Sequence, residues 1–207
     1  MSNFNVCAKC RRAGKKLFLK GEKCLSQKCP LIRRNYAPGQ HGAKQKPRLT
    51  EYAIQLQEKQ CFARMYGLRE RQMRNYYQKA AQSKGSTADI LLQLVEMRLD
   101  NIIFRMGFAQ SRPQSRNLIR DGQILVGGKK IRIASCRLKK GDVVSINPNK
   151  IKNKYFQKLQ ESIKKFKPVA WLKLDQAKMQ GHVENVPKAA EVEIPVDISK
   201  ILEFYSR

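Results

Sequence analysis

Residues 97–146 read MRLDNIIFRMGFAQSRPQSRNLIRDGQILVGGKKIRIASCRLKKGDVVSI, the most informative stretch of the chain. It opens in a helical pattern, with apolar residues on one face at helical spacing: Val95, Leu99, Ile102, Ile103 and Met106. Arg98 and Arg105 share a neighbouring face that can meet solvent or a partner. Gly107 is placed to end this helix, because glycine adopts the left-handed conformation without a Cβ penalty.

A second helix is expected to follow directly. Ser111 is the predicted N-cap, Pro113 lies in the first turn, and Gln114 completes a capping-box arrangement. Asp121-Gly122 ends the helix. Three arginines recur every fourth residue, so their guanidinium groups are expected along one edge: Arg112, Arg116 and Arg120.

The rest of the stretch predicts a small sheet. Residues 124–126 and 131–133 read as a hairpin around Gly127-Gly128, with Lys129 and Lys130 beside the turn, and residues 143–146 form a third strand. Basic side chains thus recur on successive elements, near termini and turns where backbone donors can add to anion binding. This arrangement favours nucleic-acid binding over the alternative, a solvated basic surface on an ordinary domain.

Composition points to the same class of partner. The chain has 43 Lys and Arg against 16 Asp and Glu, a net charge of +27, so a polyanion is expected. An anionic membrane would also attract this charge, but no apolar run approaches the roughly 20 residues of a membrane span. The opening MSNFNV lacks a signal-peptide layout, which predicts a cytoplasmic protein. Residues 175–207 are different, with four basic and six acidic side chains, which predicts a protein neighbour.

Four cysteines near the N-terminus form two close pairs. Cys7 and Cys10 have two residues between them, and Cys24 and Cys29 have four. This spacing predicts one structural zinc ion with four cysteine ligands, because a short, charged segment buries too little apolar surface to fold unaided. Disulfides, free thiols and an iron–sulfur cluster are the alternatives; disulfides suit a cytoplasmic chain poorly, and a cluster needs apolar shielding. Cys61 and Cys136 are interpreted as small core residues.

A basic loop follows the cysteines and contains the run YAPGQHG, residues 36–42. Tyr36 could stack on a base or ribose, with Arg33 and Arg34 on phosphates. The alternative is a surface turn with the tyrosine packed on the helix below.

These motifs carry a resemblance to a known family. The pattern RLDN…R.GFA.SR..SR.LI..G.I.V.G.KI…..KKGD resembles the S4-type RNA-binding domain, and YAPGQHG, the preceding cysteines and the ending EFYSR resemble the bacterial ribosomal S4 family over the whole chain. The resemblance implies a structural, non-enzymatic protein that binds the 5′ region of 16S rRNA early in small-subunit assembly. It implies further contacts with neighbouring ribosomal proteins, an influence on translational accuracy near the messenger entry path, and possible repression of its own messenger.

The expected fold class is α+β. A zinc knuckle and basic segment occupy residues 1–45, a helical domain 46–94, an inserted S4-type α/β domain 95–149, and a segment that packs back on the helical domain 150–207. Within the last segment, residues 151–167 predict a basic helix, VAWLKLD and GHVENVP predict short strands, and VDISKILEFYSR predicts a final helix.

Two other functions compete with this interpretation: an RNA-modifying enzyme that carries the same module, and a zinc-containing DNA-binding regulator. An enzyme would need a catalytic domain, and no nucleotide-binding glycine motif is present, while His41 and His182 lie far apart. A regulator would be expected to show a dimer seam, which the sequence lacks. The predicted RNA contacts are Arg11, Arg12, Lys15, Lys16, Arg33, Arg34, Tyr36, Gln40, His41, Arg98, Ser111, Arg112, Gln114, Arg116, Arg120, Lys129 and Lys130. No membrane or small-molecule substrate is expected as a partner.

Overall fold

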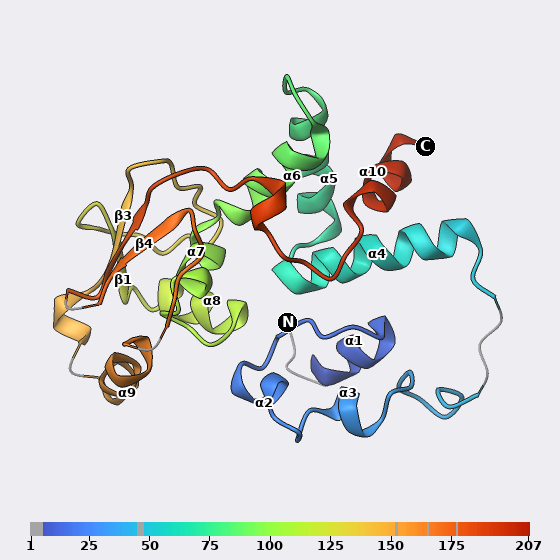
Figure 1. The fold of residues 1–207 in the computed structure, drawn as a ribbon, viewed down its shortest axis with the longest axis horizontal. Coiled ribbons are helices and arrows are strands. Elements are labelled where there is room, and N and C mark those ends of the chain that lie inside the picture. The colour runs from blue at the N-terminus through green and yellow to red at the C-terminus, as the bar shows by residue number, and fades with distance from the viewer. Residues whose placement is uncertain (1–5, 45–47, 152, 165, 177) are drawn as a thin grey trace. The chain divides into compact units, whose positions relative to one another are not determined.

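The computed structural model describes residues 6–44, 48–151, 153–164, 166–176 and 178–207 (Figure 1). Residues 1–5, on which the signal-peptide prediction rests in part, lie outside the described residues. So do Lys152 and Lys165 of the predicted basic helix. The chain divides into two compact units, the first made of residues 1–91 and 193–207 and the second of residues 92–192. None of the described helices is both long and apolar enough to span a membrane.

The first unit is helical. Its elements are α1 (Val6–Ala13), α2 (Glu22–Leu25), α3 (Pro30–Arg33), α4 (Glu51–Tyr66), α5 (Glu70–Ala81), the start of α6 (Thr87–Glu96) and α10 (Ile198–Ser206). Thr50 caps α4, since its hydroxyl accepts a hydrogen bond from the Ala53 amide at 3.3 Å. Gly67 ends α4 in the left-handed conformation.

The C-terminal helix α10 returns to the first unit and packs on α4 and α5 (Figure 1). Ile201 is fully buried, Tyr205 stacks on Tyr77 of α5 with ring centroids 4.9 Å apart, and Phe204 contacts Tyr52 of α4. Lys59, which is 6% exposed, holds its ammonium group 4.2 Å from the centroid of the Phe204 ring. Aromatic and cation–π contacts therefore fix the end of the chain.

The second unit combines helices with one antiparallel sheet. Its helices are the end of α6, α7 (Leu99–Arg105), α8 (Arg112–Arg120) and α9 (Lys154–Ile163), with 3₁₀ turns at Pro148–Lys150 and Ala189–Glu191. The single helix predicted through Val95 and Met106 is wrong, because the chain breaks between α6 and α7. There the amides of Leu99 and Asp100 bond to the carbonyls of Cys136 and Ala134. Gly107 does end α7, at a φ of 78°.

Five strands form the sheet in the order β2-β1-β3-β5-β4. They are β1 (Ile124–Val126), β2 (Lys129–Lys130), β3 (Val143–Ile146), β4 (Leu172–Asp175) and β5 (Gln180–Val183). The β3 strand and the hairpin are confirmed, since β2 pairs with β1 across the Gly127-Gly128 turn, but the second arm ends at Lys130 and residues 131–133 form no strand.

The segment after residue 149 does not return as one piece to the helical domain. β5 pairs with β3 through Val144 and Gly181, and β4 pairs with β5, so residues 150–192 extend the second unit. Residues 193–207 alone group with the first unit. The near-neutral stretch 175–207 is consequently divided between the two units.

The core of the second unit lies on one face of the sheet. Ile124, Val144 and Ile146 are buried there together with Trp171, and α9 contributes Phe156, Leu159 and Ile163 to the same cluster. Gly181 leaves space for Met106 of the α7 C-cap, since a Cβ at this position would lie 2.3 Å from the methionine sulfur. The absence of a side chain at residue 181 thus permits the helix to approach the sheet closely.

Gly181→Val is expected to destabilise the second unit by about 1–3 kcal/mol, because Met106 is fully buried and the added methyl groups overpack the core. Urea denaturation followed by the fluorescence of Trp171, the single tryptophan of the chain, measures this unit. Ser145→Ala, on the opposite face of β3, is the control and should change the unfolding free energy little. An unaltered transition for Gly181→Val would contradict this packing.

Candidate nucleic-acid interface

Two buried carboxylates organise the junction of α7 and α8. The first is Asp100, which is 2% exposed. Arg98 donates to its two oxygens at 3.0 and 2.8 Å, and Arg116 of α8 donates to Oδ2 at 2.8 Å. Asp100 therefore joins the start of α7 to the middle of α8 through charge-assisted hydrogen bonds.

The second carboxylate is Glu96, whose side chain is fully buried. Arg105 donates to both of its oxygens, at 2.8 and 3.1 Å. Asn101 donates its amide to Glu96 and accepts a hydrogen bond from Nε of Arg112 at 2.8 Å. The guanidinium of Arg112 also lies 4.6 Å from the centroid of the Phe104 ring. Asn101 thus connects the buried carboxylate of Glu96 to Arg112, in the first turn of α8, through two hydrogen bonds.

The predicted arginine edge of α8 is consequently not uniform. Arg112 and Arg98 are 6% and 3% exposed, so the structure assigns them internal contacts in place of the predicted surface ones. The Arg116 side chain retains 30% exposure, and that of Arg120 retains 74%. The reason is electrostatic, because buried carboxylates at residues 96 and 100 require cationic partners.

The predicted capping box at Ser111 is also different. Ser111 is buried and occupies the N-cap position, but its side chain makes no capping hydrogen bond. Gln114 instead accepts from the amide of Gln110, one residue earlier, at 2.9 Å. Ser111 therefore occupies the N-cap position of α8, and Gln114 bonds the backbone just before it.

The hairpin tip meets the end of α8. Gly127 and Gly128 both have positive φ, at 54° and 79°, as a tight hairpin turn of this kind requires. Lys129 and Lys130 are exposed, and the side chain of Lys130 runs over Gly122, where a Cβ would lie 1.9 Å from its Cε. Lys130 thus lies beside the residue that follows α8 and Asp121, two positions after Arg120.

The N-terminal segment uses part of its charge internally. Arg11 donates to the carbonyls of Arg34, Tyr36 and Ala37, and its guanidinium lies 4.8 Å from the centroid of the Tyr36 ring. Lys15 forms an ion pair with Glu58 of α4. These two cations shape the loop and fasten it to α4, while Lys16 is half-buried.

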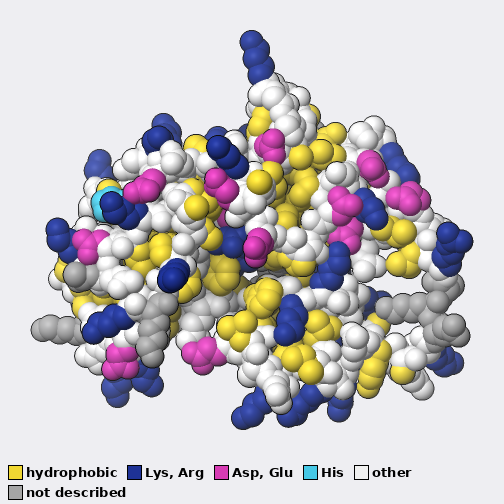
Figure 2. Space-filling view, in the orientation of Figure 1, with side chains coloured by type: hydrophobic (Ala, Val, Ile, Leu, Met, Phe, Trp, Pro, Cys, Tyr) yellow, Lys and Arg dark blue, Asp and Glu magenta, His cyan; other side chains and the backbone are white. Residues whose placement is uncertain are grey.

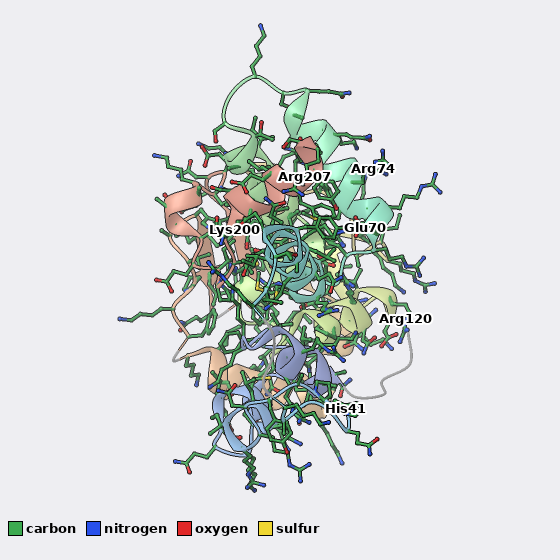
Figure 3. The ribbon with its side chains drawn as sticks, turned by 90° about the vertical axis from the view of Figure 1, so that its right-hand side faces the viewer. His41, Glu70, Arg74, Arg120, Lys200 and Arg207 are labelled. Carbon is green, nitrogen blue, oxygen red and sulfur yellow. The ribbon has the colours of Figure 1, made fainter. Side chains whose placement is uncertain are left out.

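The loop after the cysteines carries the exposed groups. Gly42 closes it, since a Cβ there would lie 1.8 Å from the Ala37 carbonyl oxygen. One face of the Tyr36 ring contacts Arg11, and the residue remains 42% exposed. Figure 3 labels His41 on this loop. Of the RNA contacts predicted in this segment, the exposed ones besides Tyr36 are Arg12, Arg33, Arg34, Gln40 and His41.

The four predicted zinc ligands lie in this segment, and all are free cysteines. Cys10, Cys24 and Cys29 are buried, and the Lys20 amide donates to Sγ of Cys24 at 3.3 Å. Burial raises the pKa of Cys10, a backbone hydrogen bond at Leu17 opposes the rise, and the charges of Cys24, Cys7 and Cys29 add to it. Among the described residues, no three Cys, His, Asp or Glu side chains are arranged to hold a metal ion.

Several exposed cations of the second unit were absent from the prediction. Arg132, Arg137, Lys139 and Lys140 are exposed after the hairpin. The run KKGD in the sequence indicated Lys139 and Lys140. Arg132 was not predicted because residues 131–133 were interpreted as a strand, and no sequence pattern indicated Arg137. Figure 2 shows Lys and Arg side chains at many separate points of the face in view, with Asp and Glu between them.

Comparisons with known proteins cover the whole chain. Residues 2–96 match the ribosomal protein S4/S9 N-terminal domain family, and residues 97–144 match the S4 domain family. The chain is 49% identical over 204 residues to small ribosomal subunit protein uS4 of Dictyoglomus thermophilum, which covers 97% of this chain and 96% of that protein. It is 46% identical to uS4A of Symbiobacterium thermophilum, with 98% and 97% covered, and 44% identical to uS4 of Acidobacterium capsulatum, with the same coverage.

Asp100→Asn is expected to destabilise the second unit by about 3–5 kcal/mol, because it leaves the buried guanidinium of Arg98 without its counter-charge. Urea unfolding followed by Trp171 fluorescence measures the loss. Asp121→Asn removes the same charge from an exposed pair with Arg120 and should cost no more than about 1 kcal/mol. Equal unfolding free energies for the two variants would show that the buried carboxylate does not hold the junction.

Proposed function

The chain belongs to the uS4 family of small ribosomal subunit proteins, and we propose that it binds the 5′ region of 16S rRNA early in subunit assembly. Its role is that of a structural, rRNA-binding component of the small subunit. We propose no catalytic activity for it. The comparisons that span nearly the whole chain are with ribosomal proteins, which leaves the competing interpretations as modifying enzyme or DNA-binding regulator without support.

The observation that carries the proposal is the corner where α8 meets the hairpin. Arg120, Lys129 and Lys130 expose their charged groups there, and the buried contacts of Glu96 and Asp100 hold the helix that presents them. A-form RNA hides its base edges in a deep, narrow major groove, so cations on a rigid corner would bind its phosphates and shape. The exposed basic loop of the first unit would bind a second RNA segment.

Finer roles follow from the family and remain part of the proposal. The protein would influence translational accuracy near the messenger entry path, and it would repress its own messenger by binding a similar RNA shape. Residues 175–207 would contact neighbouring ribosomal proteins through two separate patches, since this near-neutral stretch is shared between the units.

We also propose that Cys7, Cys10, Cys24 and Cys29 bind one structural zinc ion. Supporting this are their sequence spacing as two close pairs, the burial of three of them, and the backbone donors directed at the sulfurs of Cys10 and Cys24. Bound zinc would supply folding energy to a short segment rich in charge and would keep the four sulfurs as thiolates.

The rRNA proposal predicts selective binding with a definite salt dependence. The protein should bind fragments from the 5′ region of 16S rRNA more tightly than fragments of equal length from elsewhere in that RNA. Arg120→Gln combined with Lys130→Gln should lower the log–log salt slope by about 1.4–1.8, because each lost phosphate contact contributes about 0.7–0.9. Filter binding across a salt series measures both quantities.

Arg112→Gln is the matched control, since it removes a buried guanidinium. It should lower stability and leave the slope of the remaining folded protein unchanged. Equal affinity of the wild type for every RNA fragment would refute selective rRNA binding.

The zinc proposal predicts one zinc ion per chain in native mass spectrometry of the purified protein. Cys24→Ser should abolish or strongly weaken metal retention, because three thiolates and a hydroxyl bind zinc less well. Cys61→Ser is the control, since Cys61 lies buried in α4 and should not affect retention. A wild-type chain that retains no zinc after expression in zinc-supplemented medium would exclude the site.

A further inference from the structure

The outer face of α5 is strongly basic, and no role has been assigned to it. The inner face packs on the first unit through Met73 and Ala80, which are fully buried, and through Tyr77, which stacks on Tyr205. Figure 3 shows Arg74 on the outer side of the helix. The exposed residues of this face are Arg71, Arg74, Asn75, Gln78 and Lys79.

The one acidic residue of α5, Glu70, is already neutralised by groups beside the helix. The ammonium of buried Lys59 lies 2.9 Å from its carboxylate, and the Tyr205 hydroxyl donates to the same oxygen at 2.8 Å. Burial alone would raise the pKa of Glu70, but these two partners and the charge of Arg74 hold it below the usual value. The carboxylate is therefore ionised, and its ion pair is with Lys59 of α4.

The cations of the face outnumber its one carboxylate. Within the described part of the chain, neither Arg71 nor Arg74 lies within ion-pair distance of an acidic side chain. Glu70 and Arg74 form the one i, i+4 pair of opposite charge on the helix, and the charge of Arg74 helps to lower the pKa of Glu70. Three cations and two amides against one acid, which Lys59 already pairs, fit a ligand that is itself a line of negative charges.

The face is also held rigidly. Lys59 lies against the rings of Phe204 and Tyr205 while it pairs with Glu70, so α4, α5 and α10 meet at one ammonium group. A rigid helix presents its arginines at fixed spacing, and Arg71 and Arg74 are separated by about 4.5 Å of rise along the axis. Preorganised cations lose little entropy when they bind phosphate groups.

We propose that the outer face of α5 binds the sugar–phosphate backbone of an RNA helix, separately from the corner formed by α8 and the hairpin. This inference rests on the proposed rRNA-binding function and adds a third binding face, beside the corner and the basic loop of the first unit. Arg71 and Arg74 contact phosphate groups, and the amides of Asn75 and Gln78 donate to phosphate or ribose oxygens. The C-terminal helix supports this face, and Lys59 and Tyr205 keep Glu70 from repelling the RNA.

The test compares two double variants of the full-length protein that remove equal charge. Arg71→Gln with Arg74→Gln should lower the log–log salt slope of 16S rRNA binding by about 1.4–1.8 and weaken binding at low salt. Lys173→Gln with Lys188→Gln is the control, because both lysines are exposed in the acid-containing part of the second unit. Circular dichroism should show both variants folded, since all four side chains are exposed.

Hydroxyl-radical footprinting of the RNA gives the decisive comparison. The α5 variant should lose protection over one backbone segment, and the Arg120→Gln, Lys130→Gln variant should lose protection over a different one. The inference is overturned if the α5 variant keeps the wild-type slope and footprint, or if the control variant lowers the slope equally, which would indicate net charge alone. A wild type without RNA selectivity would instead defeat the proposed function itself.

Discussion

Burial of two carboxylates, Glu96 at the end of α6 and Asp100 at the start of α7, is the constraint on which the RNA-binding corner depends. A buried carboxylate without a partner is costly, so each must bring guanidinium groups inward. Asp100 takes Arg98 and Arg116, and Glu96 takes Arg105 directly and Arg112 through Asn101. These bonds fix α8 against α7 before any RNA arrives. The cost of ordering the corner is therefore met during folding and not during binding.

This constraint divides the arginines of one helix into two kinds. Spacing alone places Arg112, Arg116 and Arg120 along one edge of α8, and the structure confirms the helix. The three arginines differ in exposure. Arg116 bonds to the carboxylate of Asp100, which lies 16 residues earlier in the chain, and no local sequence pattern indicates that pairing. Arg120 keeps an exposed side chain, because its ion-pair partner, Asp121, is also exposed and water screens the pair. Equal spacing therefore predicted equal roles where burial produced unequal ones.

Elements determined by local chemistry were predictable from the sequence, and those determined by distant pairing were not. Thr50, Gly107 and the Gly127-Gly128 turn behave as their residue types require. By contrast, α7 separates from α6 because the amides of Leu99 and Asp100 bond to residues 134 and 136, which a helical period cannot indicate. Likewise, the patterns of residues 169–175 and 181–187 predict strands, but only the pairing of Gly181 with Val144 decides which unit they complete.

The near-neutral C-terminal stretch shows that composition alone does not indicate which part of the fold a segment completes. Its low charge suggested a single face for a protein neighbour, yet the stretch supplies β5 to one unit and α10 to the other. A helix that packs on α4 and α5 must bring apolar and aromatic groups, and Ile201, Phe204 and Tyr205 do so. The apolar and aromatic composition of α10 therefore follows from its packing on α4 and α5.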